Sequence, residues 1–119
     1  MTFWVIDWLR AFGLTLVVEL PIAAALLSAV EPRLGRRLAV IALANLATHP
    51  LVWFLFPGLA LGHGARLALS ETWAFLVELA IYLLVWPALR LRRAALTSLA
   101  ANGASFAVGL ACARLWVAP

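Results

Sequence analysis

Two glutamates, Glu19 and Glu78, each lie in the middle of a long apolar run, in the shared local sequence Val-Glu-Leu-x-Ile. A carboxylate in the hydrocarbon layer of a membrane is unfavourable by at least about 2.5 kcal/mol, and such residues normally face the interior of a helical bundle or a wet cavity. The pair therefore either joins helices by hydrogen bonds or takes up a proton or cation. Both alternatives require the surrounding runs to be membrane-spanning helices.

The composition indicates a membrane protein. Of the 119 residues, 66% are hydrophobic and only 12% are charged, whereas water-soluble domains are about half apolar and a quarter charged. A helix needs roughly 17 to 25 apolar residues to cross a bilayer core of about 30 Å, and four stretches of the chain reach that length. We predict an all-α membrane protein with a single transmembrane domain over residues 1–119. The predicted spans are residues 11–30, 38–56, 72–89 and 94–117.

Little sequence remains outside these spans for a soluble catalytic or ligand-binding domain. No nucleophile with a base, no phosphate-binding loop and no haem or quinone signature can be assembled, so we expect neither enzymatic activity nor a cofactor. Cys112 falls inside the last span, where we expect it to fill space as a small apolar residue. The arginines lie at the ends of spans, so nucleic acid is not expected as a partner.

The arginines also predict the orientation of the chain. Three lie between the first two spans and three between the last two, and short arginine-rich loops stay on the cytoplasmic side. Most tryptophans fall at the other ends of the spans, where indole rings favour the membrane–water boundary. We therefore expect cytoplasmic arginine turns, with both termini and an outer loop at residues 57–71 outside, in a multi-pass protein of the plasma (inner) membrane. The arginines are Arg33, Arg36, Arg37, Arg90, Arg92 and Arg93, and the outer tryptophans are Trp4, Trp8, Trp53, Trp73 and Trp116.

The two halves of the chain share their polar positions. Glu19 aligns with Glu78 at an offset of 59 residues, and an Asn-x-x-[Thr/Ser] motif recurs at an offset of 57. We predict two helical-hairpin repeats, although the common apolar composition of membrane helices is an alternative explanation. Repeats of two spans have parallel topology and a pseudo-two-fold axis along the membrane normal, which predicts a compact four-helix bundle. The repeats are residues 11–56 and 72–117, and their motifs are Asn45 to Thr48 and Asn102 to Ser105.

Residue counts from the arginine turns predict that the polar groups lie at one depth in the membrane. At about 1.5 Å per residue, both glutamates and the hydroxyls of Thr48 and Ser105 lie roughly 17 to 21 Å from the basic layer. Asn45 and Asn102 lie one turn nearer the cytoplasm, on the same helix faces. Two carboxyl groups this close cannot both be ionised cheaply, so they would share one proton or both be neutral. Hydrogen bonding between helices is the alternative role for all six groups.

His49 and Glu71 are further candidates. With Glu19 and Glu78, His49 would make a ligand set for a divalent metal, or it would relay protons near neutral pH. No close-spaced ligand motif supports a metal, so a hydrogen-bonded packing histidine is the alternative. Glu71 shares a helix face with Glu78. We expect it either at an outer mouth that collects cations or at a helix N-terminus, where negative charge is stabilised.

Two features bear on helix packing. Pro21 and Pro50 lie inside spans, and each is expected to disturb its helix because proline leaves a backbone carbonyl free. Small residues recur every fourth position in the last span and form a ridge on which another helix can pack closely. The ridge consists of Ala101, Ser105, Gly109 and Ala113.

Two functions fit these residues. The first is a small proton- or cation-handling transporter or channel-like protein whose site contains the two glutamates. The second is a non-catalytic structural or accessory subunit of a larger membrane protein complex, in which the same groups only fix the bundle. In both cases the expected partners are the lipid bilayer and either further copies of the chain or other membrane subunits.

Overall fold

The structure, a computed structural model, describes residues 2–116, and side chains from residue 3 to residue 113. This part of the chain forms four long α-helices and no β-strand. Each helix is long and apolar enough to cross a membrane, when α2 is counted with its irregular continuation to Gly58. The predicted all-α fold with four helices of membrane-spanning length is therefore confirmed. The helices are α1 (Thr2–Leu26), α2 (Leu34–Pro50), α3 (His63–Val85) and α4 (Leu91–Trp116).

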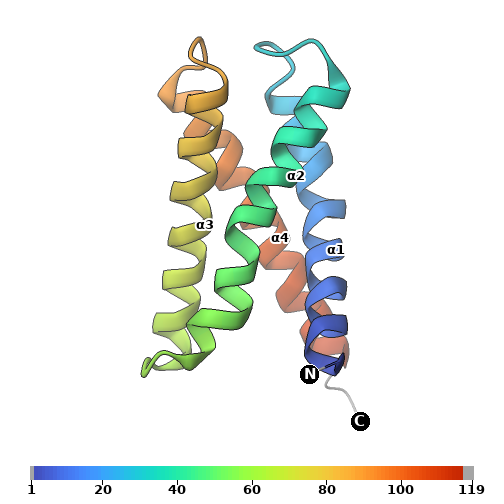
Figure 1. Ribbon diagram of the computed structural model, residues 1–119, viewed down its shortest axis with the longest axis vertical. Helices are drawn as coiled ribbons and strands as arrows, with labels where there is room; N and C mark the ends of the chain where they lie inside the picture. The colour runs from blue at the N-terminus through green and yellow to red at the C-terminus, as the bar shows by residue number, and fades with distance from the viewer. Residues whose placement is uncertain (1, 117–119) are drawn as a thin grey trace.

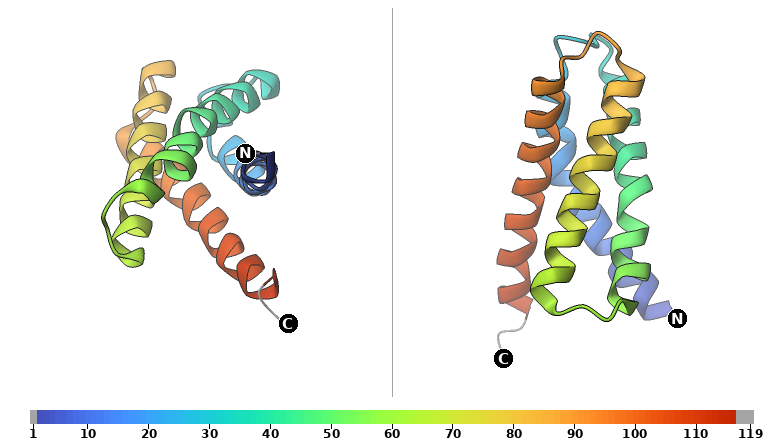
Figure 2. Two further views of the ribbon diagram at one scale, coloured as in Figure 1. Left: turned by 60° about the horizontal axis from the view of Figure 1, so that its bottom comes forward. Right: turned by 90° about the vertical axis from the view of Figure 1, so that its left-hand side faces the viewer.

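The helices form a closed bundle in which each packs against two others. α1 packs against α2 and α4, and α3 packs against the same two helices. Both arginine turns lie at one end of the bundle, and the start of α1, the α2–α3 connection and the end of α4 lie at the other (Figures 1 and 2). The bundle measures 46 × 26 × 24 Å. Its long axis matches the thickness of about 40–45 Å of a bilayer with its headgroups.

α1 and α3, the two helices that begin at the end opposite the arginine turns, start earlier than the predicted spans. α1 begins at Thr2 and not at residue 11, because its first residues are apolar enough to continue the helix. α3 begins at His63, so the outer loop predicted at residues 57–71 is wrong in extent and is confined to residues 59–62. Gly58, Gly62 and Gly64 are typical of a loop, but the Ala and Leu residues that follow them favour a helix. The predicted end of the last span at residue 117, and the side chains of Arg114 and Trp116, lie outside the described residues.

Pro50 ends the regular part of α2. A π-helical segment, Leu51–Leu55, and a 3₁₀ turn, Phe56–Gly58, follow it directly. Proline has no N–H to donate to the preceding turn, so the hydrogen-bond pattern changes at this point. The predicted disturbance at Pro50 is therefore confirmed. Pro21, by contrast, lies exposed inside α1, which remains helical around it.

Small side chains pack in the interior of the bundle beside a few large ones, Leu27, Ile41 and Tyr82. Ala23, Ala44, Ala94 and Ala101 are fully buried, and large apolar residues such as Leu84, with 79% of its surface exposed, face outward. This distribution suits a membrane, because lipid tails solvate leucine as well as a protein core does. Helix association then depends on close packing of small residues and on polar contacts between helices.

Overpacking this interior should destabilise the bundle. Ala101→Leu adds three heavy atoms at a position with no free surface, and we expect a loss of about 1–3 kcal/mol of unfolding free energy. Its neighbour Ala100 is exposed on the same helix, so Ala100→Leu is the matched control, with a change within about 0.5 kcal/mol. Unfolding in detergent micelles measures both variants. Equal effects of the two substitutions would contradict the packing described for α4.

Candidate functional site

A small polar cavity lies between the four helices and brings together the predicted site residues. Its volume is about 110 Å³, and it is partly open. That volume corresponds to roughly three or four water molecules at liquid density. Every helix contributes to its wall. The lining includes Glu19, Asn45, Thr48, His49, Glu71, Glu78, Asn102 and Ser105.

Glu78 on α3 is fully buried and receives hydrogen bonds from two other helices. The Asn102 amide of α4 donates to its Oε2 at 2.7 Å, and the Thr48 hydroxyl of α2 lies 3.5 Å from its Oε1. Asn102 also donates to the Ser98 carbonyl oxygen at 2.9 Å, which fixes the orientation of the amide. The Ser98 hydroxyl of α4 in turn donates to the Phe75 carbonyl oxygen at 3.0 Å, and this bond joins α4 to the backbone of α3.

Glu19 on α1 is 1% exposed and has one strong partner. The Ser105 hydroxyl of α4 donates to its Oε1 at 2.6 Å, whereas its Oε2 is buried without a hydrogen-bond partner among the described residues. A buried polar atom without a partner is costly, so its presence at the wall of a cavity marks a position where a proton or ligand would be stabilised.

The contacts of Thr48 and Ser105 place these hydroxyls at the depth of the glutamates, as residue counting predicted. Asn45 also lines the cavity, but its amide donates to the Ile41 carbonyl oxygen of its own helix at 3.1 Å. The predicted polar set is thus brought together in space. Its residues differ in how directly they contact a carboxyl group.

His49 lies at the edge of the cavity in an aromatic environment. Its Nε2 is 3.5 Å from the Thr15 hydroxyl, and the rings of Trp8, Phe12 and Trp53 surround it with centroid separations of 5.3 to 6.4 Å. Across the described residues, no group of three or more His, Cys, Asp or Glu side chains is arranged to hold a metal ion. Glu19, Glu78 and His49 therefore do not form the ligand set considered from the sequence, and the geometry favours a packing histidine.

Glu71 is half-buried and lines the same cavity as Glu78. The two residues are seven positions apart on α3, about 10 Å along the helix axis. Because α3 begins at His63, Glu71 lies in the helix interior, so stabilisation by a helix N-terminus does not explain it. Thr15 and Ser70 also line the cavity and were missed. Thr15 precedes Glu19 by four residues, and that helical spacing was a usable signal.

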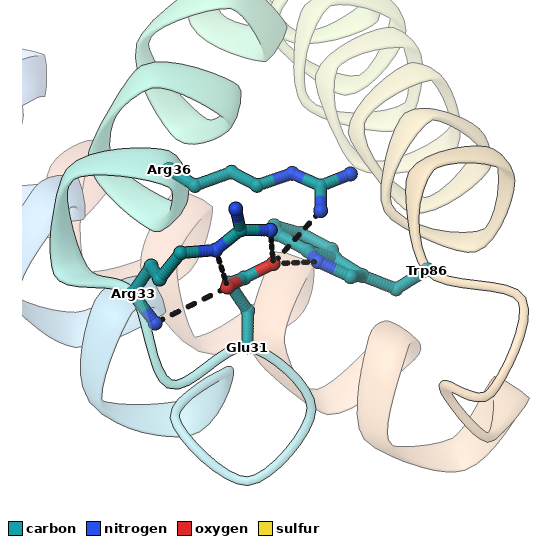
Figure 3. A network of polar contacts seen from close by, with 4 residues as sticks. All are labelled: Glu31, Arg33, Arg36 and Trp86. Carbon is teal, nitrogen blue, oxygen red and sulfur yellow. Dashed lines mark hydrogen bonds and ion pairs between the residues drawn. The ribbon is translucent and has the colours of Figure 1, made fainter.

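A second polar cluster, also missed from the sequence, lies at the arginine end (Figure 3). Glu31 is 4% exposed and accepts hydrogen bonds from Arg33 Nε at 2.9 Å, from Arg36 at 3.1 Å and from the Trp86 indole at 3.4 Å. The Arg33 guanidinium lowers the pKa of Glu31 to about 2. Arg37 beside this cluster donates to the Ala24 carbonyl oxygen in the last turn of α1. The cluster therefore joins the two turns through Trp86, at the end of α3.

The small-residue ridge of α4 divides into two parts. Ala101 is buried and Ser105 contacts Glu19, so this half packs inside the bundle. Ala113 is exposed, and a Cβ at Gly109 would meet no atom within 4 Å. The outer half of the ridge is therefore not closely approached by another described part of the chain.

No protein-family model matches the chain, and no curated protein or solved structure matches it either. The function is therefore inferred from the chemistry of the residues around the cavity.

The Glu31 cluster makes the stability of the folded chain depend on pH. The pKa of Glu31 is lowered from 4.5 to about 2, so its ionised form stabilises the folded chain above pH 4.5, and this contribution disappears as the pH falls toward 2. Glu31→Gln has no such contribution. The difference in melting temperature between wild type and Glu31→Gln in micelles should be largest above pH 4.5 and shrink toward pH 2.

Asp7 provides the control for this measurement, because it is an exposed acid paired only with Arg10 at 3.6 Å. Asp7→Asn should stay close to wild type throughout, as expected for a surface ion pair. A Glu31→Gln difference that is constant over the whole pH range would show that the carboxylate is not held by the arginines.

Proposed function

We propose that the chain is a small membrane protein that handles protons or small cations at Glu19 and Glu78. The observation that carries this proposal is that two buried carboxyl groups from different helices line one cavity with no arginine among its described lining residues. A buried carboxylate without a basic partner must be neutralised by a proton or a cation. The site therefore has the chemistry of reversible proton or cation binding.

The size of the cavity limits the cargo. Pockets for organic ligands typically have volumes of about 300–1,000 Å³, whereas this one has about 110 Å³. Apart from the three glutamates and His49, the lining donors and acceptors are neutral amides and hydroxyls. Such a lining supports a proton or a small monovalent ion and argues against an organic substrate.

Each polar residue has a role in this proposal. Glu19 and Glu78 exchange the proton or cation, and ionisation of one disfavours ionisation of the other. Thr48, Asn102 and Ser105 donate to the carboxyl groups and stabilise their charged form. The lining also includes Asn45, His49 and Glu71, and Glu71 lies at the outer mouth of the proposed path.

The proposal includes two hairpin repeats, α1–α2 and α3–α4, related by a pseudo-two-fold axis. Two reciprocal contacts support this symmetry. Glu19 of the first hairpin contacts the Ser105 hydroxyl of the second, and Glu78 of the second contacts the Thr48 hydroxyl of the first. We further propose that the arginine turns face the cytoplasm in the plasma (inner) membrane. The location of both turns at one end of the bundle supports a common side for them (Figure 1).

One observation favours the alternative, an accessory subunit of a membrane complex. The outer half of the α4 ridge, Gly109 and Ala113, lies open on the described surface. Small residues at this spacing suit close packing of a helix from a second copy or from another subunit. In that function the glutamates would only hold the bundle together.

Neutralising the carboxyl groups separates these functions. Glu19→Gln and Glu78→Gln keep the side-chain volume and one accepting oxygen but remove the ionisable group. In purified protein reconstituted into vesicles, we expect a proton- or cation-dependent flux that each variant lowers by roughly tenfold or more, because the intramembrane charge site is lost. A pH-sensitive dye inside the vesicles, with sodium or potassium gradients applied in turn, measures the flux.

Asp7→Asn removes an exposed carboxylate far from the cavity lining and should leave the flux unchanged. Glu71→Gln should reduce it less than the two central variants do. If wild-type vesicles carry no flux, and both glutamine variants still assemble with the same co-purifying subunits, the transport proposal fails in favour of an accessory subunit.

A further inference from the structure

A second and larger cavity lies at the arginine end of the bundle. Its volume is about 550 Å³, and it opens between the end of α1 and the start of α4. We call it the arginine groove, because Arg90 of the α3–α4 turn and Arg92 and Arg93 of the first turn of α4 line it. Its other lining residues are all apolar except Thr97: Leu26, Val30, Ala88, Leu96 and Thr97.

No acidic side chain among the described residues forms an ion pair with the arginines of this groove. In the other turn, Glu31 accepts from Arg33 and Arg36 at 2.9 and 3.1 Å. The α3–α4 turn contains no acidic residue, and α4 has none in its first turn. The other acidic residues lie elsewhere. Asp7 pairs with Arg10, and Glu19, Glu71 and Glu78 line the small polar cavity, which we call the carboxylate cavity. Three arginines therefore line one groove without a counter-charge from a described acidic side chain.

The walls of the groove indicate the class of ligand. Leu26 and Val30 come from the end of α1 and the turn after it, and Leu96 comes from α4. All three are apolar, and Leu96 is 52% exposed. An inorganic anion would contact only the arginines of such a groove. A ligand with an anionic head and an apolar tail would contact both the arginines and the apolar residues.

We propose that the arginine groove binds the phosphate of an anionic phospholipid, with an acyl chain lying over Leu26, Val30 and Leu96. The planar guanidinium matches phosphate oxygens with paired hydrogen bonds, which ammonium groups do not offer. The groove lies at the end of the bundle, where headgroups are found if the helices span the bilayer. It shares no lining residue with the carboxylate cavity, so lipid binding there is independent of ion handling.

Native mass spectrometry of the detergent-purified full chain tests this site. Phosphatidylglycerol, phosphatidylcholine and inorganic phosphate are added separately and in competition. Wild type should retain one phosphatidylglycerol with a preference of roughly tenfold or more over phosphatidylcholine, as expected for several arginines at one headgroup. Excess inorganic phosphate should not displace it, because the apolar contacts belong to the lipid alone.

Variants identify the residues responsible. The triple variant Arg90→Gln, Arg92→Gln, Arg93→Gln should lose the preference for the anionic lipid, whereas lysine at the same positions should keep part of it. The control is Arg10→Gln with Arg66→Gln, which removes charge at the other end of the bundle and should bind as wild type does. If the triple variant does not fold, Arg92→Gln alone, at an exposed position, should lower the preference about fivefold.

Three results would overturn the site. Equal retention of the two lipids would show apolar adhesion without phosphate recognition. Undiminished phosphatidylglycerol binding by the glutamine variants would place the lipid elsewhere. Displacement by inorganic phosphate would make the groove a free-anion site.

Discussion

The bundle depends on hydrogen bonds between buried carboxyl groups and neutral donors of other helices. Glu19 is held by Ser105 at 2.6 Å and Glu78 by Asn102 at 2.7 Å, so α4 is tied to both α1 and α3 at one level. Thr48 adds a longer contact from α2 to Glu78. In a lipid environment, apolar burial does little to hold helices together, and such contacts combine with small-residue packing to select one arrangement. Removal of a donor would leave a carboxyl oxygen buried without a partner, which is more costly than the bond itself is worth.

The features that follow from helix geometry were predictable from the sequence. A fixed rise of about 1.5 Å per residue placed Glu19, Thr48, Glu78 and Ser105 at one depth, and their contacts agree with it. The start of α3 was not predictable in this way, because glycine is a loop signal in soluble proteins but is common in membrane helices. Glu31 was missed because a glutamate directly before Pro32 is typical of the end of a helix. Its contact with Trp86 joins residues 55 positions apart, and it exists only because two turns pack together.

The two arginine turns have the same position in the fold but different electrostatics. Glu31 neutralises part of the first turn and draws Arg33 and Arg36 into a compact cluster with Trp86. The second turn keeps its three arginines without an acid, beside an apolar-walled groove. The second turn therefore carries a larger net positive charge than the first, three against two. If this end lies at an anionic membrane surface, as proposed, each arginine there contributes on the order of 1 kcal/mol of attraction.

If the central glutamates bind a proton or cation as proposed, that role is physically linked to their structural one. The Glu19–Ser105 and Glu78–Thr48 contacts each join α1–α2 to α3–α4, and each depends on a carboxyl oxygen accepting a hydrogen bond. A proton or cation on either carboxyl group competes for the same oxygens, so occupancy of the site changes the free energy of packing between the hairpins. By reciprocity, packing of the hairpins changes the affinity of the site by the same factor. A pair that only held the bundle together would have no need of a cavity beside it, and the buried Oε2 of Glu19 without a partner would then be a cost with no compensating interaction.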